Sequence, residues 1–361
     1  MPVGGCTQGE LTMSKINVVV IGLGWVATQR HIPIILRQPR LHLYGVVDKR
    51  AERLQSLSAK YPWIQTSLSQ EAEMPWGNQI QAVLIATDPL NHYRLAKHVL
   101  RAGKHLLMEK PLTMSPDEGR ELVELAEKQK LSFCVVHNFQ FARSTLRLKQ
   151  MIAEGKLGEI QSIEAVQFSN PRRRLPVWYE QLPFGLFYDE SPHMFYMLES
   201  LAGCPLMHLH STVIRHSTKN TPIHVSAHYT AGGVPVRLTM NFEAALSEWH
   251  VFVQGTRAVG IVDVFRDILV TLPNDGAHRA REILTSSVLA IATHAGGFFT
   301  SGLLLAQGKL FYGADIVWKK FMDEMDGKGA AEEISAERGL HIVEMQHDIM
   351  MKSILVDFPS A

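Results

Sequence analysis

The side chains of Lys110, Asp189 and His193 are of the types that polarise an oxygen atom and move a proton. Lys110 stands in Glu109-Lys110-Pro111, directly after an apolar run, and the carboxyl ends of parallel strands are where α/β sheets place ligands. An ammonium group there would donate to a reacting hydroxyl and stabilise negative charge on its oxygen. The alternative is a surface lysine at a strand–loop junction, and spacing alone does not decide between the two.

Asp189 and His193 lie four residues apart at the start of a predicted helix, so they share one face, together with Tyr196. The positive end of a helix disfavours an imidazolium, so the sequence predicts a neutral His193 that can take a proton. Each residue also has a structural interpretation. Asp189 suits the N-cap position, and His193 could be a hydrogen-bonded histidine near the core.

A glycine loop near the start of the chain has the pattern that holds a dinucleotide pyrophosphate. Gly22 permits a tight turn, Gly24 lets the backbone approach the phosphates, and Ala27 keeps the following helix close to the sheet. The free N–H groups and the positive end of that helix favour phosphate. The residues predicted to contact the cofactor here are Gly22, Leu23, Gly24, Trp25 and Val26.

The kind of dinucleotide is predicted from the end of the next apolar run. Asp48 stands there, where a carboxylate accepts hydrogen bonds from the adenosine ribose and repels a 2′-phosphate. This favours NAD as the cofactor. Lys49 and Arg50 follow and would hold a 2′-phosphate, so NADP remains open.

The first third of the chain alternates between apolar runs and helical segments. The runs at 16–21, 41–47, 80–86, 105–108 and 131–136 predict buried strands. The alternation predicts an α/β Rossmann domain with a doubly wound parallel sheet over residues 15–137. Residues 1–14 are mostly small and polar, and we expect them to form a disordered leader.

Beyond residue 137 the pattern changes to runs in which polar and apolar residues alternate, as in a sheet with one open face. This predicts a second domain of α+β type over residues 138–361, with a largely antiparallel open sheet. The runs are 160–168, 207–214, 223–230, 234–242, 250–254 and 259–264.

The overall composition excludes several classes of protein. A net charge of +1 offers no basic field for nucleic acid. Cys6, Cys134 and Cys204 are widely separated, which indicates a reducing compartment, and we expect the cytoplasm. The histidine pairs at 208/210 and 224/228 are joined by no carboxylate or cysteine in sequence, so no metal site is predicted.

The segment 283–308 contains no charged residue and is long enough to span a bilayer. Its many hydroxyl, glycine and amide residues break its apolar character, so we predict no membrane span. We expect a buried helix pair or a subunit contact instead.

Several local patterns together resemble the glucose-fructose oxidoreductase / inositol dehydrogenase / rhizopine-catabolism family, from about Lys15 to near the C-terminus. They are the glycine loop, Ala86-Thr87-Asp88-Pro89 with His92, Ala102-Gly103-Lys104-His105, Glu109-Lys110-Pro111, Asp189-Glu190-Ser191-Pro192-His193 and Gln254-Gly255-Thr256. The Glu-Lys-Pro motif is the most specific of them. The resemblance implies a nicotinamide cofactor, a sugar, cyclitol or nucleotide-sugar substrate, and homodimers or homotetramers assembled through open sheets of the second domain.

The resemblance also implies roles for further residues. It adds Ala86, Thr87, Pro89, His92, Glu109 and Lys110 to the residues expected at the cofactor. It makes Lys110, His193 and Asp189 the expected catalytic residues. The chain departs from the family pattern where Ser191 replaces a glycine and Tyr196 replaces an aspartate. Asn138 resembles a family position near the substrate. The residues themselves add Tyr196, on the His193 face, Tyr188, which suits stacking on a sugar ring or packing in the core, and Arg172, which suits a nucleotide-sugar diphosphate or a solvated loop.

These features predict an NAD(P)-dependent dehydrogenase or reductase. It would transfer hydride between nicotinamide and a secondary alcohol or ketone, with His193 exchanging the hydroxyl proton, Lys110 steadying the oxygen and Asp189 orienting the pair. One alternative is an enzyme that uses bound NAD transiently to cleave a glycosidic bond. Another is a non-catalytic sensor or regulator that retains the dinucleotide, although the intact Lys110 and His193 argue against it.

Overall fold

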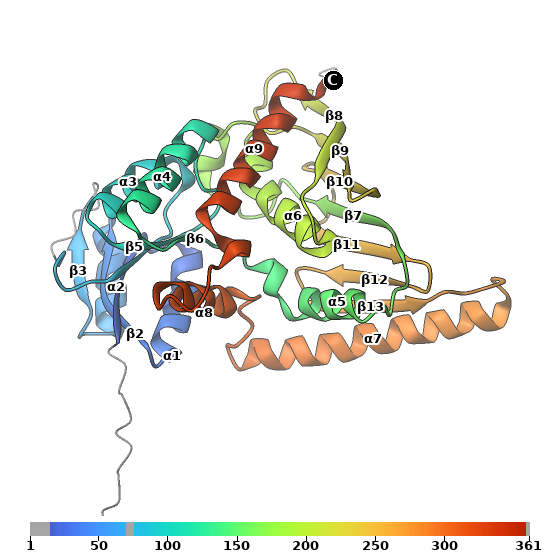
Figure 1. Ribbon diagram of the computed structural model, residues 1–361, viewed down its shortest axis with the longest axis horizontal. Coiled ribbons are helices and arrows are strands. Elements are labelled where there is room, and N and C mark those ends of the chain that lie inside the picture. Colours follow the sequence, from blue (N-terminus) through green and yellow to red (C-terminus); the bar gives the residue numbers. More distant parts are fainter. Residues whose placement is uncertain (1–14, 70–75, 359–361) are drawn as a thin grey trace, which may run out of the picture.

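The five apolar runs of the first third and one further strand form a six-stranded parallel sheet (Figure 1). The structure is a computed structural model that describes residues 15–69 and 76–358, so the expected leader, residues 1–14, lies outside the described residues. The strand order is β3-β2-β1-β4-β5-β6, which confirms the doubly wound Rossmann topology. The strands are β1 (Ile16–Ile21), β2 (Leu41–Asp48), β3 (Gln65–Leu68), β4 (Ala82–Ile85), β5 (His105–Met108) and β6 (Phe133–Val135).

Helices connect these strands and cover the sheet. They are α1 (Ile32–Arg37), which follows a π-helical turn at Ala27–His31, α2 (Ala51–Lys60), α3 (His92–Arg101) and α4 (Pro116–Gln129). The start of α4 follows from its sequence, because the Ser115 side chain accepts a hydrogen bond from the Glu118 amide and Pro116 occupies the first turn.

The second sheet has eight strands in the order β13-β12-β11-β7-β10-β9-β8-β14. It is largely antiparallel, as predicted, but β10 pairs with β7 and β14 pairs with β8 in parallel. Its strands are β7 (Ile160–Phe168), β8 (Met207–His216), β9 (His224–Ala231), β10 (Val234–Asn241), β11 (Glu248–Gly255), β12 (Ala258–Asp263), β13 (Ile268–Pro273) and β14 (Ile354–Phe358). The helices of this part are α5 (Arg143–Ala153), α6 (Leu186–Ala202), α7 (Ala280–Ala306), α8 (Ala314–Met325) and α9 (Ala336–Lys352).

The chain returns to the first core after it has built the second sheet. Trp318, Phe321 and Met322 of α8 are buried in one cluster with Val18 and Val20 of β1. Because α8 packs against the Rossmann sheet, the two sheets are held together both by the chain near residue 137 and by this packing. This packing fixes the relative position of the residues that follow β5 and those on α6.

The expectation of a buried helix pair at 283–308 is wrong. Residues 280–306 form one continuous helix, α7, in which Ser301 is the single buried residue. The polar residues do not interrupt it, because their hydroxyls bond carbonyls of the preceding turn: Thr285 to Arg281, Ser287 to Ile283, Thr293 to Leu289 and Thr300 to Gly296. Among the described residues, α7 is the helix long and apolar enough to cross a membrane.

Candidate active site

The predicted cofactor loop lies where β1 ends, beside the ends of β2 and β4. Gly22 has a φ of 92°, and a Cβ atom on it would lie 2.7 Å from the Ala86 carbonyl oxygen. Only glycine therefore fits this turn. The chain becomes helical at Trp25, so the amides of Gly24, Trp25 and Val26 are at the open amino end of a helix, where anions bind. This loop fits a dinucleotide pyrophosphate.

Asp48 holds the loop against β2. Its carboxylate accepts hydrogen bonds from the amides of Leu23, at 2.6 Å, and Arg50, at 2.9 Å, and Arg53 Nη1 lies 3.3 Å from Oδ2. The Lys49 and Arg50 side chains are exposed beside it. The prediction that Asp48 also receives the ribose hydroxyls stays a prediction, as does the preference for NAD over NADP.

Four more residues expected at the cofactor follow β4. Ala86 is the residue that crowds Gly22, Thr87 is partly exposed, and Pro89 is buried. His92 is fully buried, and its Nδ1 lies 2.7 Å from the Pro111 carbonyl oxygen. His92 thus has no exposed surface for a cofactor, and it supports the turn that carries Lys110.

Lys110 and Asp189 meet across the junction of the two domains. Lys110 Nζ lies 2.6 Å from Asp189 Oδ1 and donates to the Asp189 carbonyl oxygen at 2.8 Å. Both side chains are largely buried, with 14% and 17% of their areas exposed. The peptide bond between Lys110 and Pro111 is cis. The ion pair therefore joins the end of β5 to the first turn of α6.

Asp189 does not cap α6, so the N-cap interpretation is wrong. The helix begins at Leu186 with Gly185 at the N-cap, where φ is 54°. The sequence signal misled because a glycine that can adopt this conformation starts the helix earlier than the first acidic residue suggests. Asp189 is therefore free of capping and bonds Lys110 instead.

His193 forms a local network on α6. Its Nδ1 lies 2.7 Å from the Tyr196 hydroxyl, which also accepts a hydrogen bond from the Phe139 amide at 3.2 Å. The Tyr196 hydroxyl has one proton, and its oxygen already accepts a hydrogen bond from Phe139. That proton has an acceptor when Tyr196 donates it to His193 Nδ1. The neutral ring then carries its proton on Nε2, for which no residue in the described parts of the chain supplies a partner.

Burial lowers the pKa of His193 well below its ordinary value, and the charges of Lys110, His137 and Arg30 lower it further. The predicted neutral ring is consistent with this direction, but the predicted cause is different. His193 stands in the second turn of α6, beyond the first turn, where the helix dipole acts. Phe139 and Trp249 pack against the ring, at centroid distances of 4.9 and 5.5 Å.

Glu109 belongs to a network that the sequence does not reveal. His31 Nε2 lies 2.8 Å from its carboxylate, and His31 Nδ1 accepts a hydrogen bond from Trp318 Nε1 at 3.0 Å. Burial raises the pKa of Glu109, but the His31 hydrogen bond and the Lys110 charge outweigh it and hold the pKa below its ordinary value. Glu109 is thus a largely buried carboxylate directly before Lys110.

Arg30 is a further cation beside the site that sequence reasoning missed. Its guanidinium lies over the rings of Tyr312, Trp25 and Phe139, at 4.6, 5.4 and 5.9 Å from their centroids. Burial lowers its pKa, while Tyr312 and Glu109 raise it. No motif marks this residue, because its aromatic neighbours come from distant segments.

The remaining substrate candidates lie in different settings. Asn138 is buried and donates to the Tyr312 carbonyl oxygen, and Tyr188 is fully buried and donates to the Thr113 carbonyl oxygen. Tyr188 has no exposed face on which a sugar ring could stack. Arg172 is exposed on a loop. No group of metal-binding residues occurs within 15–69 and 76–358.

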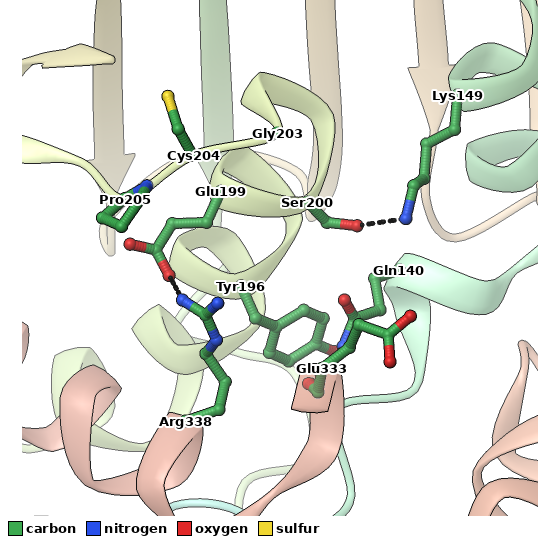
Figure 2. Close-up of a pocket in the computed structure, with 10 residues that line it drawn as sticks. All are labelled: Gln140, Lys149, Tyr196, Glu199, Ser200, Gly203, Cys204, Pro205, Glu333 and Arg338. Atoms are coloured by element: carbon green, nitrogen blue, oxygen red, sulfur yellow. Dashed lines mark hydrogen bonds and ion pairs between the residues drawn. The ribbon is translucent and has the colours of Figure 1, made fainter. Parts of the chain in front are cut away.

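A cavity of about 250 Å³ opens elsewhere beside α6 (Figure 2). Its charged groups bond protein partners: Arg338 pairs with Glu199 at 2.7 Å, and Lys149 donates to Ser200 at 2.9 Å. Tyr196 lines this cavity, but the predicted catalytic residues do not. The cavity is therefore distinct from the candidate active site and borders it at Tyr196.

The chain belongs to the GFO/IDH/MocA oxidoreductase family. The family's domain described as oxidoreductase family, NAD-binding Rossmann fold, matches residues 16–137, and the GFO/IDH/MocA C-terminal domain matches residues 145–259. These matches confirm the resemblance inferred from the motifs. They also confirm the nicotinamide dinucleotide as the cofactor of the first domain.

Among its relatives, the chain is 32% identical over 195 residues to the uncharacterized oxidoreductase YdgJ of Escherichia coli (strain K12), covering 53% of this chain and 55% of that protein. It is 30% identical over 162 residues to the D-glucoside 3-dehydrogenase of Escherichia coli (strain K12), covering 42% and 43%. It is 26% identical over 201 residues to the scyllo-inositol 2-dehydrogenase (NADP(+)) IolW of Bacillus subtilis (strain 168), covering 55% of each. The chain spans about half the length of the curated relatives it matches.

Solved structures share the fold over nearly the whole chain. KijD10, a 3-ketoreductase from Actinomadura kijaniata in complex with TDP-benzene and NADP, has a TM-score of 0.73 at 18% identity and covers 96% of this chain and 100% of its own. GenD2 from gentamicin A biosynthesis, in complex with NAD, has a TM-score of 0.72 at 15% identity and covers 95% of each chain. Both likenesses support the two-domain architecture.

Proposed function

We propose that this protein is an NAD(P)-dependent dehydrogenase or reductase that acts on a secondary alcohol or ketone of a sugar, cyclitol or nucleotide-sugar. The observation that carries the proposal is the Lys110–Asp189 ion pair beside a neutral His193, at the sheet edge where the glycine loop lies. The relatives named a glucoside dehydrogenase and an inositol dehydrogenase support the substrate class.

The residues that would hold the dinucleotide are the glycine loop, Asp48 and the segment after β4. The nicotinamide supplies a carbon that accepts or returns a hydride when it is bound. Asp48 supports NAD as the preferred form, and the exposed Lys49 and Arg50 leave room for NADP. Homodimers or homotetramers in the cytoplasm remain the expectation for the assembly.

Lys110 polarises the substrate oxygen in this proposal. Asp189 binds the ammonium through Oδ1 and through its backbone oxygen, so two of the three N–H groups have acceptors. The third is left for the substrate. A cation fixed in this way stabilises an oxygen that gains negative charge without having to reorganise. Asp189 acts here as the residue that positions Lys110.

His193 exchanges the proton with the substrate oxygen. With Tyr196 donating to Nδ1, the neutral ring presents Nε2–H, which suits a hydrogen bond to the oxygen of a ketone. As that proton passes to the oxygen, Nδ1 takes up the Tyr196 hydroxyl proton, so the ring stays neutral and the negative charge moves to the tyrosine oxygen, which accepts from the Phe139 amide. Oxidation of an alcohol needs the other tautomer, in which Nδ1–H would donate to the tyrosine oxygen. The tyrosine proton then has no acceptor among the described residues. The network therefore stabilises the donor form of His193.

The test replaces Lys110 with alanine. We expect turnover of the responding substrate from a panel of sugars, cyclitols and nucleotide-sugars to fall by about a hundredfold to ten-thousandfold. The dissociation constant of the dinucleotide, measured by fluorescence titration, should change little. The matched control is Lys128→Ala on the exposed surface of α4, which should leave both quantities unchanged.

Near-parental turnover in the Lys110→Ala protein would show that Lys110 is not catalytic. Product formation without net NADH would indicate transient use of the dinucleotide instead. Tightly retained dinucleotide with no turnover of any alcohol or ketone would indicate a sensor.

A further inference from the structure

The helix α7 leaves most of its surface without protein contact. Figure 1 shows it along the outer margin of the second domain, beside β13 and α5. Its apolar side chains are strongly exposed: Leu284 is 66% exposed, Ile291 71%, Phe299 73% and Leu305 67%. A helix that is apolar around most of its circumference is stable only when something covers it.

The exposed apolar residues extend around the helix and do not form a single stripe. Successive residues are about 100° apart, so the arc from Leu305 through Leu284 and Phe299 to Leu289 covers about 200°. The remaining arc faces the protein, where Gly297 packs closely on Ile268. A partner helix covers roughly a third of a helix surface, whereas a lipid phase covers all of an exposed arc.

The charges of the helix are confined to its ends. No Asp, Glu, Lys or Arg occurs between Ile283 and Gly308. Arg279 and Arg281 stand at the amino end, and Lys309 stands three residues beyond the carboxyl end. The carboxylates near the amino end already have partners: Glu282 pairs with Arg279, and Asp275 pairs with His278. Cations that flank an apolar helix complement anionic lipid headgroups.

The contacts of α7 also determine how it can meet a bilayer. Ser301 Oγ donates to the Asp267 carbonyl oxygen at 3.2 Å and accepts from Arg143 at 2.7 Å. Together with the Gly297 packing, these contacts hold the helix along β13. A helix attached in this way cannot stand upright in a membrane, so it lies parallel to the surface, with the protein body in place of a polar face.

We propose that α7 is a membrane-docking helix that seats the protein flat on the surface of an anionic lipid bilayer, without spanning it. The docking face consists of Ile283, Leu284, Val288, Ile291, Phe298, Phe299, Leu303 and Leu305. This proposal does not depend on the proposed function, because it rests on surface residues that are remote from Lys110 and His193.

The test is flotation of the full chain with lipid vesicles. We expect binding to vesicles of phosphatidylcholine mixed with phosphatidylglycerol, and weaker binding to phosphatidylcholine alone. Ile291→Glu together with Phe299→Glu should reduce the bound fraction at least tenfold, because both side chains would leave the lipid phase. The matched control is Val177→Glu together with Leu68→Glu, at two exposed apolar residues outside α7.

A second test concerns the flanking charges. Arg281→Gln together with Lys309→Gln should reduce binding to the anionic vesicles to the level seen with phosphatidylcholine alone. Light scattering without lipid measures the molar mass of the protein, and so tests whether a second copy of this chain covers the docking face instead. The proposal is overturned if the parent protein does not float, if the α7 and control variants float equally, or if the α7 variant only converts a dimer to a monomer.

Discussion

The two sides of the candidate site are built from different chemical groups. On the cofactor side, backbone amides hold the loop in place. The Gly22 amide donates to a backbone carbonyl, and the amides of Leu23 and Arg50 donate to the Asp48 carboxylate. On the substrate side, side chains that are distant in sequence meet, and Lys110 and Asp189 are 79 residues apart. The cofactor side depends on the shape of the backbone, and the substrate side depends on ionisation and burial.

This difference predicts different sensitivities. Added side-chain atoms displace a backbone loop, but its amides and carbonyls do not titrate, so its binding of the dinucleotide should depend little on pH. The substrate side contains His92, His137 and His193, whose pKa values are all lowered, chiefly by burial. Each of these rings is neutral in the fold and protonates more readily once the chain unfolds. Steric changes should therefore disable the cofactor side, and acid should disable the substrate side.

The largest effect that this comparison predicts is that of Gly22→Ala on dinucleotide binding. The new Cβ would lie 2.7 Å from the Ala86 carbonyl oxygen, at a φ of 92°, so the loop must move. We expect the dissociation constant of the dinucleotide to rise by about a hundredfold or more, since strain and clash together cost about 3 kcal/mol. Calorimetric titration measures it.

The matched control for this change is Gly103→Ala. Gly103 also has a positive φ, of 69°, but nothing lies within 4 Å of an added Cβ. It should show a small loss of stability and unchanged dinucleotide affinity. Equal affinities in the Gly22→Ala and parent proteins would contradict the assignment of the loop.

The sequence predicts the strands that are buried on both faces and those in which polar and apolar residues alternate. The strands that were not predicted are β3, β13 and β14, and each lies at the edge of its sheet. An edge strand has one neighbouring strand and more solvent, so its sequence is under less pressure to be apolar or to alternate. This accounts for β3 but not for β13 and β14, which contain the apolar runs Ile268-Leu269-Val270 and Ile354-Leu355-Val356. The residues of β3, Gln65-Thr66-Ser67-Leu68, give no strand signal for this reason.

The site residues that could be predicted from the sequence are those that belong to a local motif. The Lys110 and His193 positions follow from motifs, and the shared face of His193 and Tyr196 follows from helical spacing. The Arg30 guanidinium and the His31–Trp318 hydrogen bond could not be predicted in this way. Both depend on segments that are adjacent only after α8 has returned to the first core.

The next effect concerns the acid sensitivity of the substrate side. Burial lowers the pKa of His137 from 6.5 to about 4, so below pH 6.5 the unfolded chain takes up a proton that the folded chain does not. The free energy of unfolding should therefore fall as the pH drops from 6.5 to 4, by about 3 kcal/mol for this ring. His137→Gln should remove that part of the decrease.

Urea unfolding between pH 7 and pH 4 measures the change. The comparison uses the slope of stability against pH, because His137→Gln also alters the stack of this ring on Tyr196 at a centroid distance of 4.7 Å. The same slope in both proteins would show that this ring does not link the fold to acid.

The smallest expected effect separates positioning from packing on the substrate side. In Tyr196→Phe, His193 loses the hydrogen bond to Nδ1 that favours its Nε2–H form. We expect kcat to fall about fivefold while KM for the substrate changes little, since a hydrogen bond of this kind contributes about 1 kcal/mol. A bond made only to the neutral ring also lowers its pKa, so its loss should move the acid limb of the pH–rate profile to higher pH.

Tyr188→Phe provides the matched control on the same helix. Tyr188 is also buried and donates one hydrogen bond, to the Thr113 carbonyl oxygen, but it does not contact His193. If the substitutions acted only by weakening the packing of α6, both variants would lose a similar part of kcat, and neither would shift the pH–rate profile. A shift in Tyr196→Phe alone would mean that the tyrosine, which replaces a carboxylate of the family pattern, determines which nitrogen of His193 faces the substrate.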